Sequence, residues 1–152
     1  MKKAATLGLL VLAAMLSNCG SNNATGTAAT VDGTWQAVMV GGSGEASVID
    51  FNTKFTVNND NSLNVPTINF LTVGTCFVSG ATAGGTFTLT SGLNVTPITG
   101  NFSFVVQSGS PAGNTLTLTG TEDGTTITGT WTLTGGSGCA GAGDFTMTQS
   151  PA

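Results

Sequence analysis

The sequence contains no histidine, tyrosine or arginine among its 152 residues. Histidine, the commonest general base and metal ligand, is therefore missing. Arginine, which binds phosphate and carboxylate groups through two parallel hydrogen bonds, is missing as well. Without histidine, neither a Ser-His-Asp nor a Cys-His catalytic arrangement can be assembled. A zinc site lacks imidazole ligands for the same reason, and three cysteines are too few for a four-cysteine site. We therefore expect no metal and no other cofactor.

Charged side chains are scarce, at 7% of the chain against roughly 25% in ordinary soluble domains. The cations are Lys2, Lys3 and Lys54, and they face seven acids. Nucleic acid needs clustered basic residues for counterion release, so this composition excludes a nucleic-acid partner. A polybasic patch for an anionic bilayer is missing too, so any attachment to a membrane must come from a lipid.

Long apolar runs are also rare, and the one at residues 7–16 is too short to span a bilayer. With Lys2 and Lys3 before it, this run has the form of a secretory signal peptide. The four residues Leu16-Ser17-Asn18-Cys19 resemble the lipobox of bacterial lipoproteins, although Asn18 stands where that family usually has Gly, Ala or Ser. The resemblance implies cleavage before Cys19 and acylation of Cys19, including palmitate, which would anchor the protein in a membrane. Gly20 after the cysteine resembles the pattern that directs such proteins to the outer membrane.

The resulting organisation has three parts: a signal peptide over residues 1–18, the lipidated Cys19 with a flexible tether over 19–31, and a single β domain over 32–150. The tether is small, polar and without periodicity. After cleavage one lysine would face seven acids, a side-chain sum of 1 − 7 = −6.

Apolar residues in the domain recur with period two, and threonines fill most of the positions between them. Short turn-like connections separate these runs, so we predict an all-β fold, an antiparallel meander of about eight to ten strands. It would close as a small barrel, or alternatively fold as a β-sandwich. The strands are expected near residues 34–40, 47–57, 63–65, 68–73, 76–78, 86–91, 101–107, 114–120, 126–134 and 144–149.

Two similar segments mark the ends of this domain. Gly33-Thr34-Trp35 is echoed by Gly129-Thr130-Trp131, and each is followed by a Gly-rich loop and an Asp-Phe pair. We interpret them as two similar hairpins that would pair and remove exposed edges.

The tripeptide at 33–35 resembles the Gly-x-Trp signature of calycins, the superfamily of lipocalins and avidins. This resemblance implies a calycin-like barrel that is plugged by Trp35 and holds a small apolar ligand. The chain lacks the late Arg or Lys that packs on that Trp in the family, and it lacks the Tyr of an avidin-like biotin site. Trp35 and Trp131 are therefore candidates either for ligand contact or for ordinary core packing.

Besides Cys19, the chain has Cys76 and Cys139. An exported protein with an even pair of cysteines is expected to form one disulfide. This bridge would close a loop of about 64 residues and contribute on the order of 4 kcal/mol.

Acid–base chemistry depends on the carboxylates alone. Glu45, Asp50 and Asp144 lie in or after the two Gly-rich loops, where two of them could form a glycosidase-like pair. The alternative is that scattered acids only keep the domain soluble. A Ca²⁺ site at residues 58–61 is conceivable from its oxygen ligands, but the Asn-rich sequence is more typical of a turn.

We therefore expect a membrane-anchored cell-envelope lipoprotein with a non-enzymatic structural or interaction role. Its partner would be a neutral polysaccharide, an envelope protein or a small apolar ligand. The first alternative is a carrier of a small apolar ligand, and the second is a carboxylate-based hydrolase.

Overall fold

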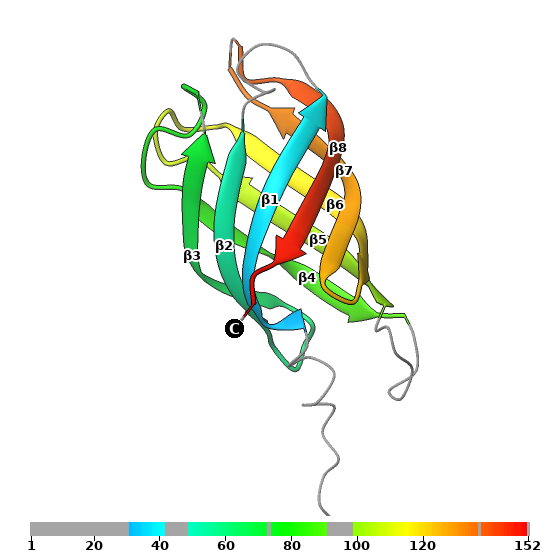
Figure 1. Ribbon diagram of the computed structural model, residues 1–152. Helices are drawn as coiled ribbons and strands as arrows, with labels where there is room; N and C mark the ends of the chain where they lie inside the picture. The colour runs from blue at the N-terminus through cyan, green and yellow to red at the C-terminus, as the bar shows by residue number, and fades with distance from the viewer. Residues whose placement is uncertain (1–30, 42–48, 73, 91–98, 137, 152) are drawn as a thin grey trace, which may run out of the picture.

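The computed structural model describes residues 31–41, 49–72, 74–90, 99–136 and 138–151. These residues form eight antiparallel strands that follow one another along the chain (Figure 1). Among them, no helix has the length and apolar character needed to cross a membrane. The strands are β1 (Gly33–Gly41), β2 (Asp50–Val57), β3 (Leu63–Thr72), β4 (Thr82–Leu89), β5 (Thr99–Gln107), β6 (Thr115–Asp123), β7 (Thr126–Thr134) and β8 (Gly141–Gln149).

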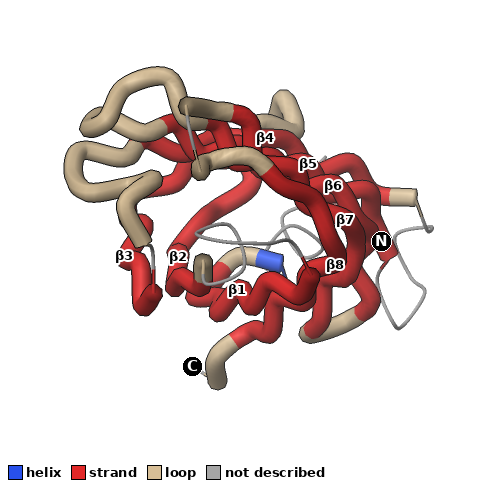
Figure 2. The backbone as a smooth tube through the Cα atoms, turned by 90° about the horizontal axis from the view of Figure 1, so that it is seen from above, coloured by secondary structure: helices blue, strands red, loops and turns tan. Residues whose placement is uncertain are grey.

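One sheet contains all eight strands, in the order β3-β2-β1-β8-β7-β6-β5-β4. Figure 2 shows the sheet curled into a ring, with β3 and β4 at its two ends. The predicted all-β meander in a barrel-shaped sheet is confirmed, and the barrel is nearly closed. The pairing of the two Trp-containing hairpins is confirmed as well, because β1 of the first hairpin pairs with β8 of the second. The ends of the sheet therefore meet between β3 and β4.

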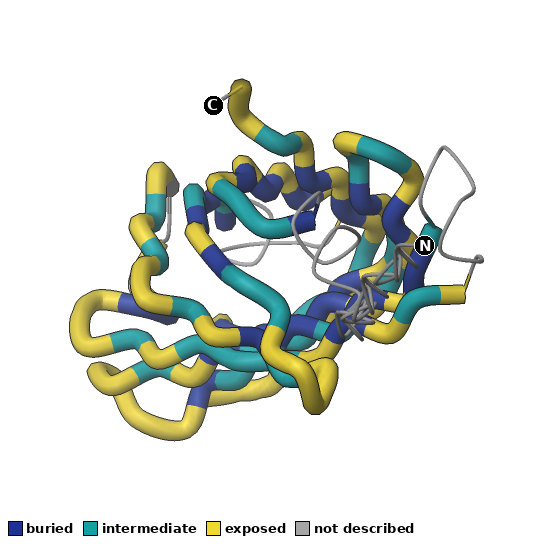
Figure 3. Tube along the Cα trace, turned by 90° about the horizontal axis from the view of Figure 1, so that it is seen from below, coloured by how far each residue is buried: buried dark blue, intermediate teal, exposed yellow. Residues whose placement is uncertain are grey.

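The core lies inside the ring. Buried and exposed positions alternate along the strands, as Figure 3 shows, because successive side chains of a strand point to opposite faces. Phenylalanine rings from separate strands meet in the interior: the ring centroids of Phe51 and Phe104 are 5.8 Å apart, and so are those of Phe55 and Phe102. Phe102 also approaches Phe145 at 6.5 Å. These contacts between β2, β5 and β8 fill the middle of the barrel.

A pair of glycines allows strands β6 and β7 to approach closely. Gly120 of β6 pairs directly with Gly129 of β7. A Cβ atom at Gly120 would lie 2.2 Å from the carbonyl oxygen of Thr128, and one at Gly129 would lie 2.1 Å from that of Thr119. Such distances are far inside van der Waals contact, so no larger residue fits either position.

Four predicted strands need correction. The expected strands 63–65 and 68–73 are one strand, β3, which continues through Pro66. Proline is tolerated there because β3 is an end strand of the sheet and because the β2–β3 register shifts between Lys54 and Thr56. The expected strand 76–78 is a loop between β3 and β4. The strand expected at 86–91 begins earlier, at Thr82, and includes Gly84 and Gly85.

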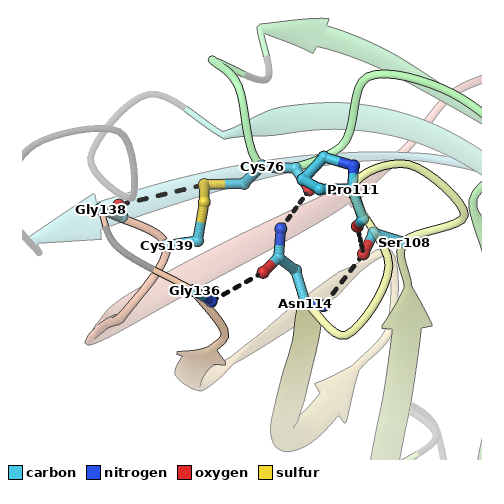
Figure 4. Close-up of a disulfide and its surroundings, with 7 residues drawn as sticks. All are labelled: Cys76, Ser108, Pro111, Asn114, Gly136, Gly138 and Cys139. Carbon is cyan, nitrogen blue, oxygen red and sulfur yellow. Dashed lines mark hydrogen bonds between the residues drawn. A yellow bond between two sulfur atoms is a disulfide. The ribbon is translucent and has the colours of Figure 1, made fainter.

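The predicted disulfide between Cys76 and Cys139 is present, with a Cα–Cα distance of 5.6 Å. It ties the β3–β4 loop to the β7–β8 loop. Asn114 lies beside the bridge and joins the same two loops (Figure 4). Its side-chain Nδ2 donates to the carbonyl of Cys76 at 2.8 Å, and its Oδ1 accepts from the backbone N–H of Gly136 at 3.1 Å. This end of the barrel is therefore held by one covalent and two hydrogen-bonded links.

Candidate functional site at the seam between β3 and β4

The two ends of the sheet meet at a seam that is only partly joined. One antiparallel bridge links Ser62 to Thr86, and the backbone N–H of Phe87 donates to the carbonyl of Asn61 at 2.9 Å. Within the residues that the structure describes, no ladder of paired residues continues from this bridge between β3 and β4. The two ends of the sheet are therefore joined at the Ser62–Thr86 bridge, and β3 and β4 are not paired beyond it in the part of the chain that the structure describes.

The register of the bridge shows which residues an extended ladder would pair. In an antiparallel pair the two residue numbers change in opposite directions, so Val65 would lie opposite Ala83, and Thr67 opposite Ala81. Those residues instead line a groove of about 490 Å³. The groove, which we call the β3–β4 seam, is formed by residues 65–69 on one side and 81–83 on the other.

Local sequence explains why the strands separate here. Pro66 has no N–H group and removes one donor from β3. The hydroxyl of Thr53 donates to the carbonyl of Thr67 at 2.9 Å, which gives that carbonyl a partner from β2.

The side chains of the seam are uncharged, and the groove mixes apolar with polar groups. The half-buried apolar residues pack against the core, and they are Val65, Ile68, Ala81 and Ala83. The exposed residues are Pro66, Thr67, Asn69 and Thr82. The seam therefore offers shallow apolar contacts together with the backbone edges of two strands.

A buried carboxylate lies elsewhere in the barrel, at Glu122. Its side chain is 1% exposed, and neither carboxylate oxygen has a hydrogen-bond partner among the described residues. Burial, with a smaller effect from the charge of Asp123, raises the pKa of Glu122 from 4.5 to about 7. Glu122 belongs to β6, between Gly100 of β5 and Ile127 of β7, and it faces inward. Glu122 is not among the residues predicted from the sequence to face inward, although its even spacing from the inward Leu116 and Leu118 is a signal of this orientation.

The other predicted site residues are dispersed. Cys19 and Glu45 lie outside the described residues. Trp35 and Trp131 are fully buried, and each indole N–H donates to a backbone carbonyl: Trp35 to Val31 at 2.9 Å and Trp131 to Val40 at 3.1 Å. Both tryptophans are core residues in these contacts. Val31 is itself fully buried, so the folded part includes a residue that we assigned to the tether.

Asp50 and Asp144 do not form a close pair. They lie on the two neighbours of β1, opposite Val38 and Val40 respectively, and two strand spacings amount to about 10 Å. The Asp50 carboxylate also accepts a hydrogen bond from the backbone N–H of Met39 at 3.2 Å. Among the described residues, no group of three His, Cys, Asp or Glu side chains is placed to hold a metal ion.

The sequence matches no family model, and no curated protein or solved structure is significantly similar to it. Its function must therefore be inferred from the chemistry of its own residues.

Proposed function

We propose that this protein is a non-enzymatic interaction protein of the bacterial cell envelope, anchored to a membrane by a lipid on Cys19. The signal-like run and lipobox-like residues before Cys19 support the anchor. The β3–β4 seam supports the interaction role, because it presents two strand edges and an uncharged groove at one place on the barrel. This open seam is the observation that carries the proposal.

A carrier of a small apolar ligand is the second candidate. A volume of about 490 Å³ lies in the range of small-molecule sites. The carrier that the calycin resemblance implies would hold its ligand inside the barrel, where the phenylalanine rings of β2, β5 and β8 already touch. A ligand would therefore have to bind in the seam, where half-buried Val65 and Ile68 supply apolar contact.

Labelling with a palmitate analogue in a bacterial host tests the anchor. The full chain should incorporate the label and enter the detergent phase on phase separation. Cys19→Ser should abolish the label, whereas Ser21→Ala, two residues away, should retain it. An unlabelled full chain in the aqueous phase would overturn the proposed anchor.

Native mass spectrometry of the purified full chain separates the two candidates. A co-purified small apolar molecule would favour the carrier. A mass equal to that of the lipidated protein alone would favour the interaction protein.

A further inference from the structure

We propose that the β3–β4 seam accepts an extended, uncharged peptide segment of a partner protein, which inserts as an additional strand. This inference rests on the proposed interaction role and specifies the chemistry of the partner.

The backbone edges supply the first reason. One side of β3 is paired with β2, and one side of β4 is paired with β5. The opposite sides face the seam, where the described residues form only the bridge at Ser62 and Thr86. An added strand offers N–H and C=O groups to both edges, which is the mode of β-strand addition. A small apolar molecule cannot satisfy these backbone groups.

The dimensions of the seam limit the segment. Its longer side is residues 65–69, and a strand rises about 3.3 Å per residue, so about five residues of the partner are in contact. Because β3 and β4 are antiparallel, the inserted strand runs parallel to one of them and antiparallel to the other.

The side chains of the segment should alternate. Val65, Ala81 and Ala83 are half-buried and pack against the core, so they favour small apolar side chains on the inner face of the segment. Thr67 and Thr82 are exposed and suit polar side chains on the outer face.

Charge also limits which peptide segments the seam can accept. None of the described residues that line the seam is charged, so a charged group directed inward would lose its hydration without gaining a partner from them. The mature chain would also carry one lysine against seven acids, so it repels an acidic segment. An uncharged segment rich in Val, Ala and Thr meets both conditions.

The test uses the full lipidated chain in detergent micelles and a capped, fluorescein-labelled peptide of alternating Val and Thr. A second peptide of the same sequence is N-methylated at alternate residues, which removes backbone donors. Fluorescence anisotropy should show saturable binding of the first peptide and at least tenfold weaker binding of the second. Hydrogen exchange should show protection of β3 and β4 by the first peptide, with β7 unchanged.

Ala83→Lys places a charge in the seam and should weaken binding of the first peptide at least tenfold. Ala142→Lys, at an exposed position of β8, is the matched control and should bind like the native chain. Thermal unfolding verifies that both variants are folded. If Ala83→Lys fails to fold, the comparison of the two peptides still decides the question.

Equal binding of the two peptides, or no binding of either at about 1 mM, would overturn the proposal. Saturable binding of laurate, lost in Ala83→Lys, with no binding of the peptide would assign the seam to a small apolar ligand and would also overturn it. None of these results affects the palmitate labelling at Cys19, so failure of the seam proposal and failure of the anchor are distinguishable.

Discussion

The indole Nε1 of Trp131 donates a hydrogen bond to the carbonyl oxygen of Val40, 3.1 Å away, across the strand that separates them. Gly143 of that strand lies beneath the contact: a Cβ atom there would be 2.1 Å from the same carbonyl oxygen and 2.9 Å from Nε1. We predict that Gly143→Ala lowers the free energy of unfolding by about 3 kcal/mol, because the backbone of β1 must shift and the hydrogen bond is lost. Urea unfolding measures this loss.

Gly136→Ala is the matched control. A Cβ at Gly136 would meet no atom within 4 Å, so this variant should stay within about 0.5 kcal/mol of the native chain. Equal stability of the Gly143 and Gly136 variants would contradict the importance of the Trp131 contact.

The buried Glu122 predicts a pH-dependent stability. Its pKa is raised from 4.5 to about 7 in the folded protein, chiefly by burial. The folded state therefore holds the proton more tightly than the unfolded state, and the contribution to stability is full below pH 4.5 and is lost as the pH rises to about 7. The loss is on the order of 3 kcal/mol. Glu122→Gln should therefore be the more stable protein at pH 8 and should differ little from the native chain at pH 4.5.

The measurement is urea unfolding of both proteins between pH 4 and pH 8. Asp144→Asn removes the same charge from an exposed position of β8 and serves as the control. The free energy of unfolding of the control should change with pH as steeply as that of the native chain. The free energy of unfolding of Glu122→Gln should change less over the same range. If the free energy of unfolding depended on pH equally in the native protein and in Glu122→Gln, the folded state would not bind this proton more tightly than the unfolded state.

Much of the barrel could be predicted from period-two patterning. The strand expected at 126–134 has the bounds of β7, because alternating Ile127, Trp131 and Leu133 with threonine between them admits one register only. The echo of Gly33-Thr34-Trp35 at Gly129-Thr130-Trp131 correctly predicted the pairing of the first hairpin with the last. The disulfide followed from the even pair of cysteines in a chain with a predicted export signal.

The seam could not be predicted in the same way. Proline at 66 and glycines at 84 and 85 are local signals for a break, and they led to a divided β3 and a late β4. The structure instead keeps both strands and places these residues where the ends of the sheet meet. The location of an open edge depends on the tertiary arrangement of eight strands, which no local pattern contains. Asn114 was missed for the same reason, since its partners are distant in sequence.

Removal of the disulfide is the third prediction. The bridge joins residues 63 positions apart, so the chain-entropy model gives a contribution of about 4 kcal/mol. The double variant Cys76→Ser/Cys139→Ser should lose about that amount in urea unfolding. Mass spectrometry of the non-reduced native chain should show the two cysteines joined. A loss below about 1 kcal/mol would mean that the unfolded chain is already restrained by other means.

Asn114→Ala is the fourth prediction. The buried amide holds the carbonyl of Cys76 and the N–H of Gly136, so its removal leaves two backbone groups to find new partners. We expect a loss of about 2 kcal/mol in the disulfide-bonded protein. Because Asn114 and the disulfide join the same two loops, their effects should not be additive. In the background without the disulfide the loops are free to separate, so the same substitution should cost at least about 0.5 kcal/mol less. Equal losses in the two backgrounds would mean that Asn114 and the disulfide stabilise the barrel independently.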